Sequence, residues 1–256
     1  MNKQDIEKII YGALTAGRKS LLEPEAKKLI SAWGISVPKS IQIPPHPPLR
    51  PPRPLLQKEG TEGRSKGGRK FPSSAVKKLT PPYVLKVVSQ DILHKSEAGG
   101  VVTDIKNIKE LNNVWTKMAK NISHNMPTAR IEGFLLEEMS PRGVEVIIGG
   151  LRDTQFGPVV IFGTGGISVE LMKDVSYRLA PLNKKEALDM IREVKGYPLL
   201  TGFRGSKPAD INSLSETIIK LSEILIEIED IREIEINPLL VYEKGVMAVD
   251  VRVVLI

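Results

Sequence analysis

Apolar residues recur along this chain with two different periods, which predicts a mixture of helices and strands. A spacing of about three or four residues is typical of amphipathic helices, and it occurs at residues 3–15, 23–34, 108–122, 184–195 and 212–228. Compact apolar runs predict strands, at residues 35–43, 83–88, 101–105, 130–137, 144–150, 158–162, 231–242 and 246–255. The last two strands should form a hairpin that turns at Glu243-Lys244-Gly245. Mixed elements with antiparallel strand pairs indicate the α+β class.

One segment, Pro44–Pro72, fits neither period. Eight of its 29 residues are proline and four are glycine, and this composition forms neither a helix nor a central strand. We expect an exposed insertion with polyproline II character, and a proline-rich docking segment is the alternative. The segment holds seven Lys and Arg against two Glu, which gives +5 of the chain's net charge of +7. Because the remainder is nearly balanced, the charge does not indicate that the folded body binds nucleic acid.

The composition narrows the class of protein. A chain of 256 residues with 41% hydrophobic and 26% charged residues is typical of a soluble globular protein with one or two domains. It has no run of 18 apolar residues, and its charged N-terminal stretch is typical of an amphipathic helix and not of a signal peptide. Without cysteine it has no disulfide and no thiolate nucleophile. We therefore expect a cytoplasmic protein with no membrane partner.

The first candidate site combines a lysine, a histidine and two glycines. Lys86 lies within the apolar run Tyr83–Val88, where a buried ammonium would need a partner such as a phosphate; alternatively, Lys86 lies at a strand edge and reaches solvent. His94 precedes Gly99 and Gly100, whose backbone can approach an anion closely. Imidazole can carry a phosphoryl group, act as a base or bind a ligand, although a lone histidine is more often structural.

Two further stretches could contact a nucleotide. Glu138 and Met139 end an apolar run, and a strand end can offer a backbone carbonyl and N–H to an adenine edge. Glu145 could bind ribose hydroxyls, and the alternative is that these acids only face solvent. Gly165 and Gly166 follow the apolar run VVIF in a turn that is similar to a phosphate-binding loop. That turn matches neither a Walker A loop nor a dinucleotide-binding fingerprint, so by itself it is a weak signal.

The C-terminal hairpin carries candidate metal ligands. Glu235 and Asn237 are two residues apart and therefore share one face of a strand, and the hairpin would bring Asp250 alongside them. Carboxylate and amide oxygens suit Mg²⁺, which keeps waters and adds phosphate oxygens. A polar edge hairpin without a metal is the alternative, but polar side chains placed between apolar residues are costly without a cation.

Taken in order, a lysine strand, a glycine loop, an acidic hinge and a paired-strand metal site resemble the ATP-grasp fold, in which two α+β lobes hold a nucleotide between them. More narrowly, the chain resembles the beta subunit of acetyl-CoA synthetase (ADP-forming), also called acetate–CoA ligase (ADP-forming). The resemblance rests on LLEPEAKKLISAWGISVP, VLKVVSQDILHKSEAGGV, GVEVIIGGLRDTQFGPVVIFGTGGISVELMKDVSYRLAPL, LLTGFRG and EINPLLV. It covers nearly all of the chain except Pro44–Pro72, and HKSEAGGV together with EINPL is its most specific part.

The resemblance implies a reaction in which acyl-CoA, ADP and phosphate are interconverted with a carboxylic acid, CoA and ATP, with Mg²⁺ as cofactor. A phosphohistidine on a CoA-binding alpha subunit would pass its phosphoryl group to the nucleotide site of this chain, where His94 matches a second, relaying histidine. The resemblance assigns further roles: phosphate binding to Lys86, adenine contact to Glu138 and Met139, ribose contact to Glu145, and Mg²⁺ binding to Asn237 and Asp250 with Glu235 near them.

The resemblance also implies a domain plan. Residues 1–43 and 73–133 would form the small lobe, residues 44–72 an insertion in place of a short helical connection, and residues 134–256 the large lobe with the Mg-nucleotide site. Glu97 stands where succinyl-CoA ligases have a lysine, which favours the acetate-type branch. No CoA-binding domain is recognisable, so an alpha subunit should complete an α2β2 complex. The alternatives are a succinyl-CoA-ligase-like or other ATP-grasp ligase subunit, a non-catalytic nucleotide-binding module, and a basic scaffold that binds RNA or membrane through Pro44–Pro72.

Overall fold

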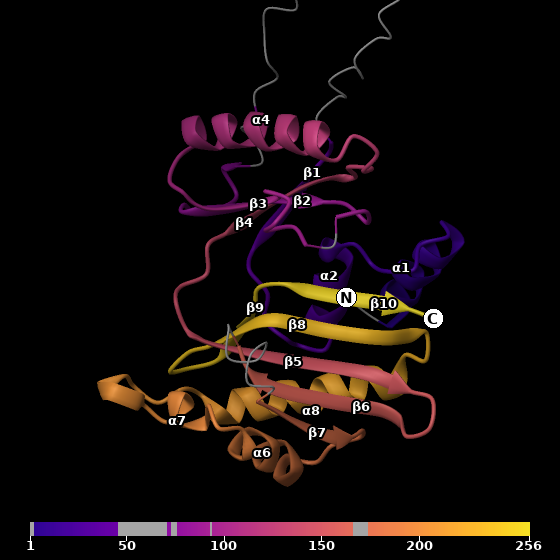
Figure 1. The fold of residues 1–256 in the computed structure, drawn as a ribbon, viewed down its shortest axis with the longest axis vertical. Helices are drawn as coiled ribbons and strands as arrows, with labels where there is room; N and C mark the ends of the chain where they lie inside the picture. Colours follow the sequence, from indigo (N-terminus) through magenta and orange to yellow (C-terminus); the bar gives the residue numbers. More distant parts are fainter. Residues whose placement is uncertain (1–2, 46–70, 73–75, 93, 166–173) are drawn as a thin grey trace, which may run out of the picture. The chain divides into compact units, whose positions relative to one another are not determined.

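The computed structural model describes residues 3–45, 71–72, 76–92, 94–165 and 174–256. The chain forms two compact units: the first comprises Met1–Pro38 and Ser140–Ile256, and the second comprises Lys39–Met139. Their elements are labelled in Figure 1. Among the residues that the structure describes, no helix is both long and apolar enough to cross a membrane.

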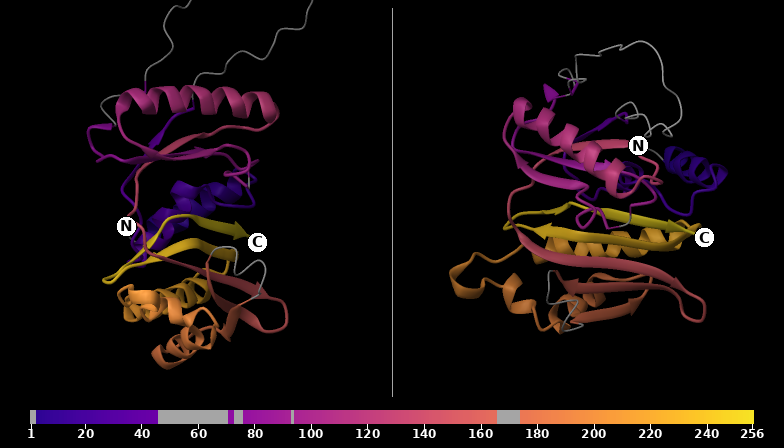
Figure 2. Two further views of the ribbon diagram at one scale, coloured as in Figure 1. Left: turned by 60° about the vertical axis from the view of Figure 1, so that its left-hand side comes forward. Right: turned by 45° about the horizontal axis from the view of Figure 1, so that its top comes forward.

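The second unit is built on a four-stranded antiparallel sheet with the order β1-β4-β2-β3. The strands are β1 (Ser40–Ile43), β2 (Tyr83–Val88), β3 (Val101–Ile105) and β4 (Gly133–Glu138). Helix α4 (Ile108–Asn125) lies along one face of this sheet in all three views (Figures 1 and 2). Strand β2 pairs with β3 on one side and with β4 on the other, and all of its residues are buried. It is therefore a central strand of the sheet.

Helix α4 begins at the N-cap residue Asn107, and Glu110 adds a second side-chain acceptor beside it. The Glu110 N–H donates to Asn107 Oδ1 at 3.0 Å, and Glu110 Oε2 accepts from the Lys106 N–H at 2.9 Å. Such side-chain acceptors satisfy N–H groups that the first helical turn leaves without a backbone partner. The buried face of the helix then presents Leu111, Trp115, Met118, Ala119 and Ile122 to the sheet.

Phe71 belongs to the core of this unit. Its side chain is 2% exposed, its N–H donates to Asn112 Oδ1 at 2.6 Å, and its ring meets Trp115 edge-on at a centroid distance of 5.2 Å. Trp115 in turn meets Phe134 of β4 edge-on at 6.1 Å. The expectation that Pro44–Pro72 is an exposed insertion is therefore wrong at its C-terminal end, because an aromatic ring there completes the core. Residues 46–70 lie outside the described residues.

The first unit is built on a larger antiparallel sheet with the order β10-β8-β5-β6-β7, to which β9 adds by pairing with β8. The strands are β5 (Val144–Asp153), β6 (Gly157–Thr164), β7 (Val175–Leu179), β8 (Ile231–Val241), β9 (Val246–Ala248) and β10 (Val251–Leu255). The helical segments are α1 (Lys3–Thr15), α2 (Glu23–Ala32), α6 (Lys184–Glu193), α7 (Tyr197–Leu200), the 3-10 turn η1 (Phe203–Gly205) and α8 (Ile211–Glu227).

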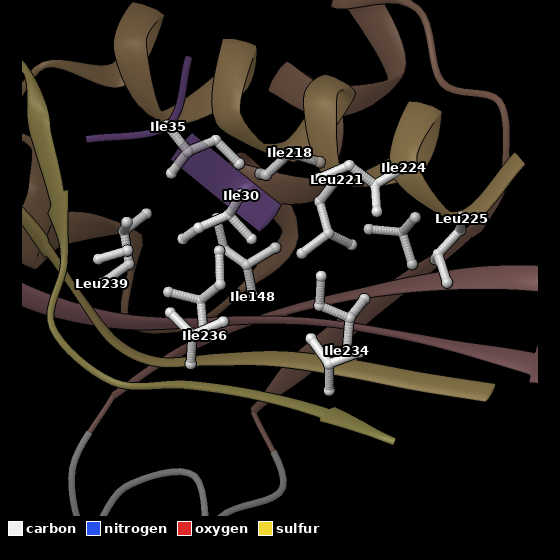
Figure 3. Close-up of a cluster of buried hydrophobic side chains, with 14 of the residues drawn as sticks. Ile30, Ile35, Ile148, Ile218, Leu221, Ile224, Leu225, Ile234, Ile236 and Leu239 are labelled. Carbon is white, nitrogen blue, oxygen red and sulfur yellow. The ribbon is translucent and has the colours of Figure 1, made fainter. Parts of the chain in front are cut away.

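Helix α8 covers one face of this sheet. Figure 3 shows Ile148, Ile234 and Ile236 from the strands beside Leu221 and Leu225 from the helix, and all five are essentially excluded from solvent. The helix lies so close to β5 that a Cβ atom on Gly150 would come within 2.2 Å of the Leu225 side chain. Because side chains alternate along a strand, the neighbouring odd-numbered residues of β5 and β8 point to the opposite, open face of the sheet.

The N-terminal helices pack in this same unit, so the prediction that residues 1–43 belong to the small lobe is wrong for residues 1–38 and right only for the last five residues, which include β1. Ile30 and Ile35 lie in the core beside α8 (Figure 3). The chain before α2 also extends the sheet edge, because the Leu21 N–H donates to the Val253 carbonyl at 3.0 Å. The predicted boundary at residue 134 is wrong as well: β4 completes the four-stranded sheet, and the larger unit resumes at Ser140.

Candidate active site

Lys86 on β2 is buried and paired with an acid. Its ammonium Nζ lies 3.0 Å from Glu137 Oε2, and the two side chains are 4% and 1% exposed. Both project from the face of the small sheet opposite α4, since Leu85 and Leu136 pack in the core under that helix. The alternative that Lys86 lies at a strand edge and reaches solvent is therefore wrong. Sequence reasoning gave Glu137 no such role, because its partner lies on a strand that is distant in the chain.

His94 opens a tight turn that ends at Gly100. The His94 carbonyl accepts from the Ala98 N–H at 3.1 Å, and the Lys95 carbonyl accepts from the Gly100 N–H at 2.6 Å. Gly99 has φ +67°, a left-handed conformation that favours glycine. A Cβ atom on Gly100 would lie 2.5 Å from the Val87 side chain. Glycine is therefore favoured at position 99 by the backbone conformation and at position 100 by the lack of space for a side chain. His94 itself is exposed to solvent.

The end of β4 is held by backbone hydrogen bonds. The Glu138 N–H donates to the Lys39 carbonyl at 3.0 Å, and the Met139 N–H donates to the Pro82 carbonyl at 2.9 Å. Glu138 Oε1 also accepts from the Thr80 N–H at 2.9 Å. Burial, and secondarily the Glu138 carboxylate, raise the pKa of the Tyr83 hydroxyl. Both N–H groups of this predicted hinge are occupied, which leaves backbone carbonyl oxygens as the groups that could face an adenine amine.

In the larger unit, Gly165 packs directly on the backbone of Glu145. The Gly165 N–H donates to the Glu145 carbonyl at 2.9 Å, and a Cβ atom on Gly165 would come within 2.9 Å of that same carbonyl. Only glycine fits this approach, so the predicted ribose contact and the glycine turn lie side by side. The Glu145 side chain is exposed. Gly166 lies outside the described residues.

Asp174 is a buried residue of this region that sequence reasoning missed. Its carboxylate accepts from the Lys195 N–H at 2.7 Å, from the Gly196 N–H at 2.9 Å and from the Thr164 hydroxyl at 3.2 Å. The end of β6, the start of β7 and the turn after α6 are thereby tied together. No pattern in the sequence pairs Asp174 with these partners, since the nearest is ten residues away.

The C-terminal hairpin brings the predicted metal ligands together. Asn237 on β8 lies opposite Asp250, the residue just before β10, and the Asn237 N–H donates to the Asp250 carbonyl at 3.1 Å. Glu235 shares the face of Asn237, and its Oε1 accepts from Asn237 Nδ2 at 3.0 Å. Ile236, between them, and Ile234, just before them, point into the core. Glu235 and Asn237 therefore share a face of β8, and the backbone pairing brings Asp250 alongside them.

This donor set fits a hard cation that retains other ligands. With its NH₂ group turned toward Glu235, the Asn237 amide keeps its oxygen as an acceptor, and carboxylate and amide oxygens suit Mg²⁺. Among the described residues, no group of three or more His, Cys, Asp or Glu could hold a metal by itself. Two carboxylates and an amide would therefore need waters or phosphate oxygens to complete the coordination, as Mg²⁺ normally has.

A cavity of about 290 Å³ opens beside Glu235 on the face of the sheet opposite α8. Its walls are mostly aliphatic, and its charged members are Glu233, Glu235 and Arg252. Gly149 lies beneath it, and a Cβ atom there would meet only ordinary contacts, the nearest at 3.6 Å. Packing therefore does not require this glycine, and its missing side chain enlarges the cavity.

The predicted residues fall into two sets: Lys86, His94, Gly99, Gly100, Glu138 and Met139 in one unit, and Glu145, Gly165, Glu235, Asn237 and Asp250 in the other.

The glycine turns, the paired-strand acids and the two α+β units define an ATP-grasp protein. The family model of the ATP-grasp domain matches residues 71–255, and the chain belongs to this family. Within it, the chain belongs with the beta subunits of ADP-forming acetate–CoA ligases. It is 41% identical over 240 residues to acetate–CoA ligase [ADP-forming] I subunit beta of Pyrococcus furiosus, covering 94% of each chain.

Solved structures and a longer relative agree with this placement. Acetyl-coenzyme A synthetase 1 of Ca. Korarchaeum cryptofilum, in complex with coenzyme A and Ca-AMPCP, has a TM-score of 0.85 and 40% identity, with 98% of this chain and 99% of that chain covered. Another structure of that enzyme, with Mg-AMPPCP and a phosphohistidine segment pointing towards the nucleotide binding site, has a TM-score of 0.78 and 37% identity, with 98% of this chain and 100% of that chain covered. The 4-hydroxybutyrate–CoA ligase [ADP-forming] of Nitrosopumilus maritimus is 38% identical over 245 residues, which are 96% of this chain and 32% of that protein. The predicted fold and family are confirmed.

Proposed function

We propose that this chain is the nucleotide-binding subunit of an ADP-forming acyl-CoA synthetase. The reaction is the conversion of acyl-CoA, ADP and phosphate to a carboxylic acid, CoA and ATP. The observation that carries the proposal is the set of Glu235, Asn237 and Asp250 on one face of a hairpin, beside a cavity on the open face of the sheet. The close relatives that are named as ADP-forming ligases support the same activity.

Mg²⁺ is the cofactor that this donor set suits. Asn237 and Asp250 hold it, with Glu235 close by, and a bound divalent cation neutralises charge on the phosphate oxygens of the nucleotide. Glu235 orients the Asn237 amide through the 3.0 Å hydrogen bond between them. The adenosine is bound by the end of β4 at Glu138 and Met139 and by the Glu145 carboxylate, and the phosphates by Lys86 and the glycine turns.

His94 carries the phosphoryl group during the reaction. A phosphohistidine on the partner subunit donates its phosphoryl group to an imidazole nitrogen of His94, and the partner's N–P bond breaks as the new one forms. An oxygen of the ADP β-phosphate then attacks the phosphorus, the His94 N–P bond breaks, and the imidazole nitrogen recovers the electron pair that it used to form that bond. The exposed position of His94 at a turn suits a group that must meet two partners.

The partner is a CoA-binding alpha subunit, and the complex is an α2β2 heterotetramer in the cytoplasm. Longer relatives support a division of labour, since the Nitrosopumilus maritimus ligase matches this chain over only 32% of its length. The remaining length of that protein is large enough for CoA-binding domains. Selection of the acid therefore belongs mainly to the partner subunit.

Reconstitution tests the proposal. The chain is co-purified with its CoA-binding subunit, and ATP formation is measured from ADP, phosphate and acetyl-CoA, 4-hydroxybutyryl-CoA or succinyl-CoA, with and without Mg²⁺. We expect ATP only when Mg²⁺ and an acyl-CoA are present, and a loss of at least about a hundredfold for Asp250→Ala, which removes a metal ligand. Asp230→Ala, which removes an exposed carboxylate from the same unit, is the control. A complex that forms no ATP from any acyl-CoA would refute the activity.

A further inference from the structure

Arg252 lies on the same sheet face as the proposed metal ligands, and no role has been assigned to it. It is paired directly across from Glu235 in the antiparallel register of β10 with β8. Its neighbours on β10, Val251 and Val253, point into the core. Alternation along the strand therefore places Arg252 on the open face, two residues from Asp250.

The guanidinium of Arg252 does not stabilise the fold through an ion pair with the glutamate opposite it. An arginine directly opposite a glutamate would normally pair with it, but Glu235 accepts from Asn237 instead. Across the part of the chain that the structure describes, Arg252 has neither an ion pair nor a side-chain hydrogen bond. Arg232, on the same strand pair, does pair with a carboxylate, that of Glu233, at 3.2 Å. Arg252 thus presents its donors to a cavity and not to a neighbouring carboxylate.

Arg252 is exposed at the cavity, and its surroundings leave its donors available to an anion. It lines the cavity of about 290 Å³ together with aliphatic side chains that have few polar atoms to compete for its N–H groups. The aliphatic residues of this lining are Ile147, Leu151, Ile161, Val175, Ile234 and Val254. Two carboxylates, Glu233 and Glu235, share the rim and favour a cation there.

We propose that Arg252 binds the terminal phosphate of the nucleotide, next to the Mg²⁺ held by Asn237 and Asp250. This inference rests on the proposed function and adds a substrate-binding residue to that site. A guanidinium offers a planar fork of donors that matches two phosphate oxygens, which a metal ion alone does not provide. The spacing along the strand is compatible with this role. Residues two apart on one strand are separated by about 7 Å, so a diphosphate bound to the metal at Asp250 would extend toward Arg252.

The test compares nucleotides that differ in their phosphates. The full chain and its complex with the CoA-binding subunit are titrated with ADP, a non-hydrolysable ATP analogue and AMP, each with Mg²⁺, for the wild type, Arg252→Lys and Arg252→Gln. We expect Arg252→Gln to weaken binding of ADP and of the ATP analogue by roughly tenfold to a hundredfold, the effect of one or two charge-assisted hydrogen bonds. AMP, measured by competition with a fluorescent nucleotide, should change less than twofold. Arg252→Lys should lie between the wild type and Arg252→Gln.

Arg232→Gln is the matched control, since it removes the same charge from a residue of the same strand pair that is already paired with Glu233. It should leave binding of all three nucleotides unchanged. Equal losses for AMP and ADP in Arg252→Gln would overturn the proposal and show a structural role, as would unchanged ADP binding. If the wild type itself binds no Mg-ADP, the proposed function fails with it. If the wild type binds and Arg252→Gln binds equally well, only the role of Arg252 fails.

Discussion

Lys86 and Glu137 form an ion pair across two strands of the smaller sheet, with Nζ and Oε2 separated by 3.0 Å and both side chains almost fully buried. The pair lies diagonally across strands β2 and β4, since Lys86 faces Leu135 and Glu137 faces Val84. A buried charge is tolerated only when a partner compensates it. Each member of the pair therefore depends on the other.

Removal of one member should destabilise the fold strongly. We expect Glu137→Ala, which leaves the Lys86 ammonium buried and without this partner, to lower the free energy of unfolding by about 3–5 kcal/mol. Denaturant unfolding followed by circular dichroism measures this change. The control is Glu243→Ala, which breaks the exposed Lys207–Glu243 pair and should cost less than about 1 kcal/mol. Similar effects for the two variants would contradict the difference in burial.

Gly100 should be intolerant of any side chain, for a reason that differs from that at Gly99. A Cβ atom at Gly100 would lie 2.5 Å from Val87 Cγ1, so Gly100→Ala should destabilise the chain by roughly 1–3 kcal/mol through overpacking. Gly12→Ala is the control, because that position in helix α1 is surrounded by open space. Alanine there should be neutral or stabilise the helix by up to about 1 kcal/mol. Thermal melting of both variants distinguishes a steric cause from a general sensitivity to Gly→Ala changes.

Asp210 should make the stability of the larger unit depend on acid pH. Its carboxylate caps α8 by accepting from the Ser213 N–H at 3.0 Å, and it also accepts from the Gly245 N–H at 2.8 Å in the hairpin turn. The backbone N–H of Ser213, and next that of Gly245, lower the pKa of Asp210. Because the folded pKa lies below the unfolded value of about 3.9, the stabilisation is fully present above the unfolded pKa. It is lost as the pH falls through the folded pKa.

The variant Asp210→Ala tests this sign. Its melting temperature should lie below that of the wild type at neutral pH, and the gap should narrow as the pH falls below about 4. Asp230→Ala, which removes an exposed carboxylate, serves as the charge-matched control and should show a small gap throughout. A gap for Asp210→Ala that widens in acid would contradict the assignment.

The local elements could be predicted from the sequence wherever the apolar pattern matched burial. The predicted ranges for α1, β2 and β3 coincide with the observed ones. Strand β7 was missed because its pattern is reversed: Ser176 is buried and donates its hydroxyl to the Met190 carbonyl at 2.9 Å, whereas Tyr177 and Leu179 are exposed. A hydrophobic period predicts that a face is buried, but it does not identify a polar residue that is buried through a hydrogen bond.

The apolar pattern did not predict which elements pack against one another. The amphipathic face of α2 predicted that Leu29 and Ile30 would be buried, but it did not specify the core of the larger unit, so the N-terminal segment was assigned to the wrong lobe. The juxtaposition of the proposed metal ligands was predictable because Glu235 and Asn237 are two residues apart on β8, and a short turn brings the chain back to Asp250 opposite Asn237. The roles of Glu137 and Asp174 depend on contacts between distant segments, and no local spacing predicts them.

His94, as a transient phosphoryl carrier, leads to the sharpest prediction for the activity. Direct transfer requires reacting atoms within about 3–3.5 Å, which two sites in different subunits rarely reach, so a carrier at an exposed turn would solve this problem. His94→Ala and His94→Gln are assayed in the complex in two separate reactions: phosphorylation of the partner subunit from acyl-CoA and phosphate, and formation of ATP from ADP.

The carrier model predicts that partner phosphorylation survives in both variants while ATP formation falls by roughly two orders of magnitude or more. ADP affinity should change less than twofold, since the residues proposed to contact the nucleotide remain. The matched control is His124→Gln, which alters another exposed histidine of the same unit and should leave both reactions intact. If His94 only donates a hydrogen bond to a nucleotide phosphate, glutamine can replace it, because its amide N–H is also a donor. Near-normal ATP formation by His94→Gln would therefore exclude the carrier role and leave only a positioning role for this histidine.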